Sequence, residues 1–253
     1  MSLLRLITFR PQQEPAGPWT PARISTALWL DADASDTITL NGTTISEWSD
    51  KKGNLITVSQ STPSAQPTLA LNSLNGKPTL SFDGSDGLLS VAGALQLSSF
   101  VIFVAYKITN RNAVICGVSH ATPHSSPWFR WVIYPLNNNV IEYRIDGSVV
   151  QGGIQNSNFN ILSLSTGNTE AFLNGNNVLS GINRTITYPT AQPFLIGQNS
   201  SNGGRMVGNI AEIVIVSGSI STENRLKMEG YLAHKWGLTA NLPVDHPYKI
   251  TPP

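Results

Sequence analysis

The feature that constrains this chain most lies near its end, where a strand pattern runs directly into a helix pattern. Residues 208–216 are rich in β-branched side chains and lie between two glycines, which is typical of a buried strand. Ser221 provides an N-cap, because its hydroxyl can accept a hydrogen bond from the free amides of a first helical turn. The apolar spacing predicts a helix over 222–237, with Gly237 where a helix end favours a left-handed residue. The sequence therefore predicts a β-sandwich closed by one short C-terminal helix.

The rest of the chain predicts about a dozen short strands with turns roughly every 8–12 residues. Asn174-Gly175, between two apolar pairs, is a strong hairpin signal. We therefore expect an all-β fold: an antiparallel sandwich or jelly roll that forms one domain over 23–253. The expected strands lie at 27–32, 45–50, 78–82, 99–108, 112–118, 128–134, 140–145, 159–166, 169–173 and 193–197.

Residues 1–22 differ from the remainder. An apolar strand candidate, 3–9, precedes four prolines within eleven residues, a density that forbids a helix and favours an extended arm. Two interpretations remain open: a disordered terminus, or an arm that docks on a neighbouring subunit.

Composition excludes several classes of function. Only 12% of the residues are charged and the net charge is +1, which argues against nucleic-acid binding, since phosphate recognition needs clustered Lys and Arg. Cys116 is the single cysteine, so an intrachain disulfide is impossible, and we expect a buried, small hydrophobic side chain. Residues 1–10 do not make a convincing signal peptide, and no apolar run is long enough to cross a membrane. We expect a soluble protein that is made in a reducing compartment without a classical export signal.

The later half of the chain resembles the laminin-G-like branch of the concanavalin A-like lectin/glucanase superfamily. The resemblance rests on an Asn-Gly hairpin, a strand ending in Ile-Gly, a Gly-x-Ile-x-Glu strand and an Ile-Ser turn. These motifs are Ala171–Leu179, Phe194–Gly197, Gly208–Val216 and Ile220–Ser221.

Further motifs are similar to a narrower subgroup that occurs in virion proteins of tailed bacteriophages and in bacterial surface proteins. The resemblance spans about 27–248 and implies the sandwich fold strongly, whereas function is implied weakly, because this fold serves lectins, hydrolases and structural modules alike. The matching segments are Leu28–Ala32, Trp48–Asn54, Asn75–Pro78, Leu80–Ser85, Glu229–Leu238, Leu242–Pro243 and His246–Tyr248.

The acidic residues do not match a hydrolase. Glucanases of the superfamily carry carboxylates at Glu-x-Asp-x-x-Glu spacing on one strand, where alternation places them on one face. The nearest segment here, 142–146, lacks the third acid, so we predict no catalytic residues. The resemblance implies that calcium is a possible ligand at the sandwich rim, where Asp83 and Asp86 could contribute; no other cofactor is expected.

The aromatic segment 128–134 has two interpretations. In a strand, Trp128 and Tyr134 lie on one face and Trp131 lies on the other. One face must belong to the core, and the other could present aromatic rings on which a sugar stacks. Core packing is the interpretation that we favour for each single residue.

Several other residues are expected to stabilise the fold. We interpret the buried aromatic residues as core side chains whose polar edges need a partner, the glutamate as a paired carboxylate that ties the sheet to the following turn, and the final histidine–tyrosine pair as a lock for the C-terminal tail. These residues are Trp29, Trp48, Glu212, Tyr231, Trp236, His246 and Tyr248.

From these observations we predict a non-enzymatic structural protein of a phage virion, made in the host cytoplasm. The first hypothesis is host attachment through cell-surface glycans, as part of a tail fibre or tail tip. The alternative is a capsid decoration (cement) protein whose arm, 1–22, holds neighbouring virion proteins. A glycoside hydrolase or its carbohydrate-binding module is the third hypothesis. In the first two, we expect the protein to form a homo-oligomer in the particle.

Overall fold

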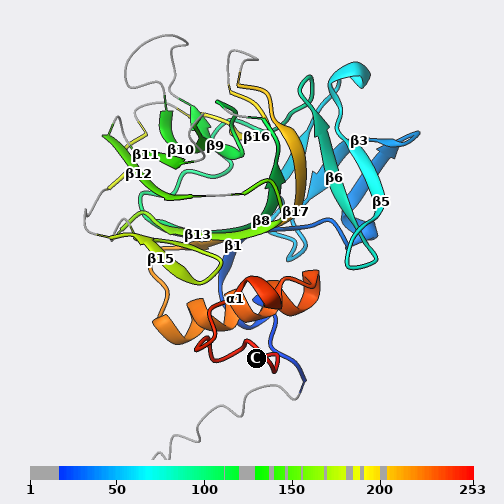
Figure 1. Ribbon diagram of the computed structural model, residues 1–253. Coiled ribbons are helices and arrows are strands. Elements are labelled where there is room, and N and C mark those ends of the chain that lie inside the picture. Colours follow the sequence, from blue (N-terminus) through cyan, green and yellow to red (C-terminus); the bar gives the residue numbers. More distant parts are fainter. Residues whose placement is uncertain are drawn as a thin grey trace, which may run out of the picture.

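The computed structural model describes residues 17–110, 112–119, 129–136, 140–145, 148–154, 156–167, 170–180, 185–188, 191–199 and 204–253. In this part of the chain, two layers of antiparallel strands face each other, and helix α1 (Thr222–Trp236) lies against the outside of one of them (Figure 1). The predicted all-β jelly-roll sandwich with one C-terminal helix is therefore confirmed. Among the described residues, no helix is long and apolar enough to cross a bilayer.

The sheet that carries the helix is called the helix-side sheet below. A hairpin of β5 (Thr68–Leu74) and β6 (Lys77–Asp83) extends it, because β6 pairs with the first half of β17. In order of pairing, its other strands are β1 (Thr26–Asp31), β17 (Val207–Ser217), β8 (Phe100–Ile108), β13 (Asn160–Ser165), β14 (Glu170–Leu173) and β15 (Asn176–Leu179).

The opposite layer is called the far sheet. It is joined to the helix-side sheet through one pair, Thr44 with Thr68, which connects β3 to β5. In order of pairing, its strands are β12 (Ser148–Ile154), β11 (Val140–Ile145), β10 (Phe129–Pro135), β9 (Cys116–Ser119), β16 (Phe194–Ile196), β7 (Leu88–Ser90), β4 (Thr57–Ser59), β3 (Thr44–Ser49) and β2 (Ile38–Asn41).

The core lies between the sheets and continues under the helix. Strand β8 is buried along almost its whole length, because the far sheet covers one of its faces and α1 covers part of the other. This explains why its sequence is a continuous apolar run and does not alternate. Cys116 is fully buried, as predicted, and burial raises the pKa of its thiol.

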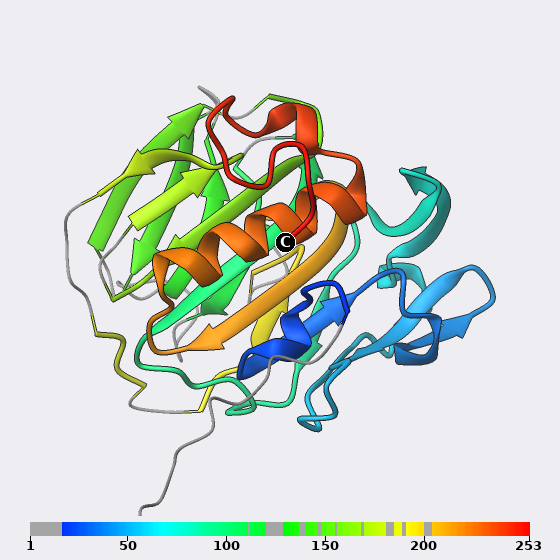
Figure 2. The same ribbon diagram turned by 90° about the horizontal axis from the view of Figure 1, so that it is seen from below.

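Helix α1 begins and ends where the sequence predicts. The Ser221 hydroxyl accepts a hydrogen bond from the backbone N–H of Asn224 at 3.2 Å, and Gly237 adopts the left-handed conformation, with φ 68°. Met228, Leu232 and Trp236 are buried against the sheet. Seen from the helix side, α1 lies across the helix-side sheet and the C-terminal segment folds back over it (Figure 2).

The sequence-based strand assignment is incomplete in the polar regions. The predicted strand over 112–118 is too long, because Asn112 has a left-handed φ of 55° and β9 starts only at Cys116. Five strands were not predicted, because they are short, half-exposed or interrupted by glycine: β2, β4, β5, β7 and β12. The described residues also form four short 3-10 helices: η1 (Pro21–Arg23), η2 (Ser35–Thr37), η3 (Pro63–Ala65) and η4 (Thr239–Asn241).

The two described chain ends meet below α1. The Trp19 side chain is buried with its ring edge toward Tyr231, at 6.3 Å between centroids, and its backbone N–H donates to the carbonyl oxygen of Pro253 at 3.1 Å. The last part of the predicted arm, 17–22, therefore packs on its own domain. Residues 1–16 lie outside the described residues, and the docking of the arm on a neighbour stays a prediction.

Candidate functional site

The outward face of the far sheet carries one continuous row of paired residues. On β10, Ile133 faces the core, whereas Val132 belongs to a small separate cluster with Val114 and Tyr134. The pairing register extends this outward position across the nine strands of the far sheet, with an apolar centre that lies between Arg144 on one side and Ser59, Glu47 and Thr39 on the other. From β12 to β2 the row reads Val149, Arg144, Val132, Gly117, Leu195, Leu89, Ser59, Glu47 and Thr39.

One polar end of this face has a connected set of side chains, which we call the Tyr134 row: Tyr134, Glu142, Arg144 and Gln151. Tyr134 on β10 lies directly opposite Glu142 on β11, and Glu142 lies opposite Gln151 on β12. Glu142 accepts a hydrogen bond from the Arg144 guanidinium and another, at 3.0 Å, from Nε2 of Gln151. The Arg144 guanidinium also lies 5.6 Å from the centre of the Tyr134 ring.

The Tyr134 row combines fixed polar groups with partial exposure. Glu142 is buried, and the Arg144 side chain is 31% exposed, while Gln151 is exposed. Tyr134 is half-buried; burial raises the pKa of its phenol, and the Arg144 charge acts in the opposite direction. Because neighbouring strands hold these groups in place, they offer donors, acceptors and one aromatic ring with little loss of side-chain entropy on binding.

The predicted aromatic platform is only partly preserved. Strand alternation correctly places Trp131 and Tyr134 on opposite faces, but Trp131 is 1% exposed and packs between Phe100 and Phe194, at 4.6 and 5.7 Å between ring centroids. Trp131 is therefore a core residue and is not available to a ligand in this conformation. Trp128 lies outside the described residues.

The other polar end of the far sheet is a hollow that the sequence analysis missed. Gln66 is held at its floor, where Oε1 accepts from the Thr44 hydroxyl at 2.7 Å and Nε2 donates to the Gln60 carbonyl oxygen at 2.7 Å. A cluster of Ser and Gln over 59–66 was the available sequence signal. The hollow is lined by Asn41, Ser46, Glu47, Ser59, Gln60, Ser61 and Gln66.

Asp83 and Asp86 lie together in the turn after β6. Oδ2 of Asp86 accepts from the Asp83 backbone N–H at 2.9 Å, and Oδ1 of Asp83 accepts from the N–H and hydroxyl of Ser85. The Ser85 hydrogen bonds lower the pKa of Asp83, whereas burial raises the pKa of Asp86 to about 6. Both carboxylates are thus engaged in the turn. Among the described residues, no three His, Cys, Asp or Glu side chains converge, and calcium binding stays a prediction.

Glu212 lies between β17 and α1 and accepts four hydrogen bonds. Oε1 accepts from Nε1 of Trp29 at 2.6 Å and from the Tyr231 hydroxyl at 3.0 Å, and Oε2 accepts from Nε1 of Trp236 at 2.7 Å and from Nζ of Lys235 at 2.8 Å. Burial raises the pKa of the Glu212 carboxyl, and the Lys235 ammonium opposes this shift. All four donors are bound in the fold, so this carboxylate holds the helix to the sheet.

The remaining aromatic and tail residues that the sequence analysis singled out also contact groups of the protein itself. Nε1 of Trp48 points to the carbonyl oxygen of Asp31 at 3.4 Å. Near the C-terminus, Nε2 of His246 lies 3.3 Å from the Glu229 carboxylate, and the carbonyl oxygen of Tyr248 lies 3.0 Å from Nε2 of His234. These contacts hold the tail against α1.

The comparisons with known proteins support the fold. No family model matches the chain, and no curated protein matches it. Among solved structures, the chain is similar to domain 4 of AbnA, a GH43 extracellular arabinanase from Geobacillus stearothermophilus in complex with arabinotriose, with a TM-score of 0.55 and 16% identity over 78% of this chain and 94% of that one.

A second similar structure is the Trypanosoma rangeli sialidase in complex with sialic acid, with a TM-score of 0.52 and 15% identity over 81% of this chain. The chain spans about a third (34%) of that sialidase. At these identities the likeness establishes a lectin-like β-sandwich fold and does not assign a ligand or an activity.

Proposed function

We propose that this protein is a non-enzymatic glycan-binding module and that the Tyr134 row contacts the sugar. The observation that carries the proposal is the alignment of Tyr134, Glu142 and Gln151 across three neighbouring strands, in which Gln151 donates a hydrogen bond to Glu142. Sugars present hydroxyls that donate and accept together with an apolar ring face. A carboxylate, a guanidinium, an amide and an aromatic ring match both properties. The arabinotriose bound to domain 4 of AbnA is consistent with this class of ligand.

We propose no hydrolysis at this site. Glycosidases need two carboxylates that flank the bond to be cleaved. Glu142 is the single acid of the Tyr134 row, and its ion pair with Arg144 and its hydrogen bond with Gln151 occupy both oxygens. A binding role therefore requires no change in the ion pair or the hydrogen bond of Glu142. Release of reducing sugar from a bound glycan would contradict this part of the proposal.

For the biological setting we propose a tailed-phage virion, with the module used for attachment to the host surface at the tail. The support is the resemblance of Leu28–Ala32, Trp48–Asn54 and Glu229–Leu238 to phage virion proteins. The arrangement fits this role, because Trp19 and Pro253 meet below α1 while the far sheet lies on the opposite side of the sandwich (Figure 1). The side with the chain ends would face the particle, and the Tyr134 row would face outward.

A glycan-array measurement on the full chain, with and without a calcium chelator, tests the proposal. We expect specific binding that survives chelation, because the Tyr134 row contains no metal ligand set. Binding that is lost on chelation would move the site to the rim acids Asp83 and Asp86. A blank array from folded protein would contradict glycan binding and would favour the capsid-decoration role, in which residues 1–22 hold neighbouring virion proteins.

A further inference from the structure

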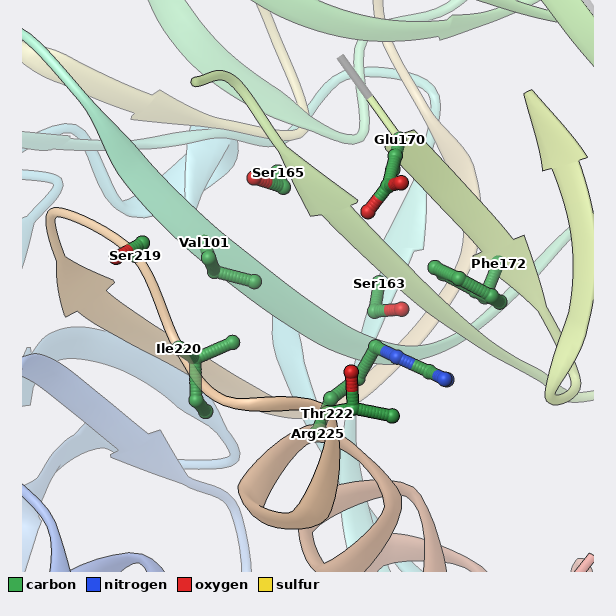
Figure 3. Close-up of a pocket in the computed structure, with 9 residues that line it drawn as sticks. All are labelled: Val101, Ser163, Ser165, Glu170, Phe172, Ser219, Ile220, Thr222 and Arg225. Carbon is green, nitrogen blue, oxygen red and sulfur yellow. The ribbon is translucent and has the colours of Figure 1, made fainter. Parts of the chain in front are cut away.

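A second polar pocket lies on the other side of the molecule, between the helix-side sheet and the start of α1 (Figure 3). Its wall on one side is formed by β13 and β14, and on the other by the turn that leads from β17 into the helix. It shares no residue with the Tyr134 row. It is lined by Val101, Ser163, Ser165, Glu170, Phe172, Ser219, Ile220, Thr222 and Arg225.

Two of these lining residues, Phe172 and Ile220, belong to segments that carry the family resemblance, where they indicate the fold only. The sequence analysis assigned no binding role to any residue of the pocket. The pocket is therefore defined by the packing of the helix on the sheet, and we refer to it as the α1 pocket.

The floor of the α1 pocket is a row of paired residues across the helix-side sheet. Glu170 lies opposite Ser165, Ser165 lies opposite Val101, and Val101 lies opposite Val216. A second hollow, on the other side of the turn before α1, continues this row at Val216 and shares Ser219 and Ile220 with the α1 pocket. Polar groups therefore line both sides of one turn of the chain, above a partly apolar floor.

Arg225 is fixed at one end of the α1 pocket. Its Nη1 donates to both oxygens of Glu229, at 2.8 and 2.9 Å, and its guanidinium lies 3.7 Å from the centre of the Phe172 ring. The Ser163 hydroxyl lies 3.2 Å from the same Glu229 carboxylate. Because Glu229 neutralises the arginine charge, Arg225 offers directed N–H donors without a net positive charge.

Glu170 supplies hydrogen-bond acceptors to the α1 pocket. Its carboxylate points into the space between β13, β14 and the turn before the helix (Figure 3), and no ion pair involves it among the described residues. With Arg225 neutralised, this carboxylate gives the pocket a net negative charge. An anionic ligand is therefore disfavoured, whereas a neutral molecule with several hydroxyls finds both acceptors and donors.

We propose that the α1 pocket binds a neutral sugar residue, at a site separate from the Tyr134 row. Glu170 accepts hydrogen bonds from ligand hydroxyls, Arg225 donates to them, and the hydroxyls of Ser165 and Thr222 do either. Val101 and Ile220 supply apolar surface for the ring. The proposal goes beyond the proposed function, because it neither requires nor follows from binding at the far sheet.

Saturation-transfer NMR on the full chain tests the proposal, with methyl glycosides of glucose and galactose and with N-acetylglucosamine as neutral probes. N-acetylneuraminic acid serves as the anionic probe. We expect at least one neutral probe to bind, and both Glu170→Gln and Ser165→Leu to weaken it by about tenfold or more, the change that corresponds to about 1.4 kcal/mol. Glu223→Gln, in the exposed first turn of the same helix, should leave binding unchanged.

The outcomes separate the two sites. Neutral-sugar binding that Arg144→Ala abolishes and Glu170→Gln leaves intact would overturn the α1 pocket and support the Tyr134 row. The reverse pattern would support the α1 pocket alone. No binding of any neutral probe, or equally tight binding of N-acetylneuraminic acid at the α1 pocket, would also overturn the inference. If Ser165→Leu lowers the melting temperature, the nearly isosteric Glu170→Gln carries the test.

Discussion

The indole nitrogen of Trp29 donates to Glu212 at 2.6 Å, although the two residues are 183 positions apart in the chain. Trp29 lies on the edge strand β1, and Glu212 lies on β17, beneath the helix. The same carboxylate accepts from three donors of α1, which are Tyr231, Lys235 and Trp236. A single buried side chain therefore connects the edge of the sheet, its centre and the helix.

We predict that Glu212→Gln lowers the free energy of unfolding by about 3–5 kcal/mol, the range observed when one partner of a buried ion pair is removed. An amide cannot accept at both positions, and its NH2 group would face existing donors. Urea denaturation followed by tryptophan fluorescence measures the change. Glu223→Gln is the matched control, because Glu223 is an exposed helix residue paired with Lys227. Equal stability of Glu212→Gln and the control would contradict the structural role.

A second prediction concerns Gly230, on the buried side of α1. Alanine normally stabilises a helix interior relative to glycine by about 1 kcal/mol. Here an added Cβ would overlap Cβ of Tyr248 and lie 2.8 Å from its Cγ, so we expect Gly230→Ala to destabilise the protein by about 1–3 kcal/mol. Alanine at position 248 would keep the overlapping Cβ, so the clash is removed only in a Tyr248→Gly background, where the same substitution should be neutral or stabilising. A double-mutant cycle from thermal unfolding measures this reversal, and its absence would show that Tyr248 does not lock the tail over the helix.

The sequence was sufficient for features that depend on local periodicity. Alternation correctly separated Trp131 from Tyr134, and the Ser221 and Gly237 signals correctly placed both ends of α1. Long apolar strands such as β8 and β17 were also predicted, because burial leaves a continuous apolar run in the sequence.

The rest depends on pairing between distant segments. Neither the alignment of Glu142 with Gln151 nor the meeting of Glu170 and Arg225 follows from local patterns, since each requires the register of several strands or the position of the helix. Strands such as β7 contain only three residues, too few for periodicity to be recognised. Sequence analysis therefore identified the sandwich, but it could only name Trp128, Trp131 and Tyr134 together as candidate sugar contacts. Trp131 is buried, in agreement with the core packing that the sequence analysis favoured for each single residue.

A third prediction concerns the pH dependence that Asp86 introduces. Burial raises the pKa of its carboxyl from the ordinary value of 3.8 to about 6 in the folded protein. Between these two values the folded state binds more protons than the unfolded state, so this group makes the protein less stable as the pH rises from about 4 to 6. We expect Asp86→Asn to remove this contribution to the pH dependence of stability. The unfolding free energy of the wild type minus that of the variant should therefore decrease as the pH rises across that range. Parallel curves would contradict the raised pKa.

A fourth prediction concerns the Tyr134 row. Arg144→Ala removes a donor and frees the buried carboxylate of Glu142, so we expect glycan affinity to fall by about tenfold or more. Tyr134→Phe should reduce affinity less than Tyr134→Ala if the ring face contributes more than the hydroxyl. Val149→Ala, on the same face of β12 but exposed and apolar, is the control. Calorimetric titration with a glycan identified on the array measures these values, and an unchanged affinity in Arg144→Ala would move the site elsewhere.

The last prediction concerns Trp19, which lies within the segment that the sequence assigned to the arm. Because its side chain is buried against the domain, with its ring edge toward Tyr231, we expect Trp19→Ala to lower the free energy of unfolding by about 3 kcal/mol. Leu55→Ala, at a position that is 97% exposed, should change it little.

A chain that starts at Gly17 keeps the Trp19 contacts, whereas one that starts at Arg23 loses them, so the shorter chain should be the less stable of the two. The chain that starts at Gly17 therefore tests the docking arm without loss of the Trp19 contacts. If this chain folds normally but no longer assembles with other virion proteins, residues 1–16 carry the attachment. If assembly is undiminished, the docking-arm hypothesis is wrong.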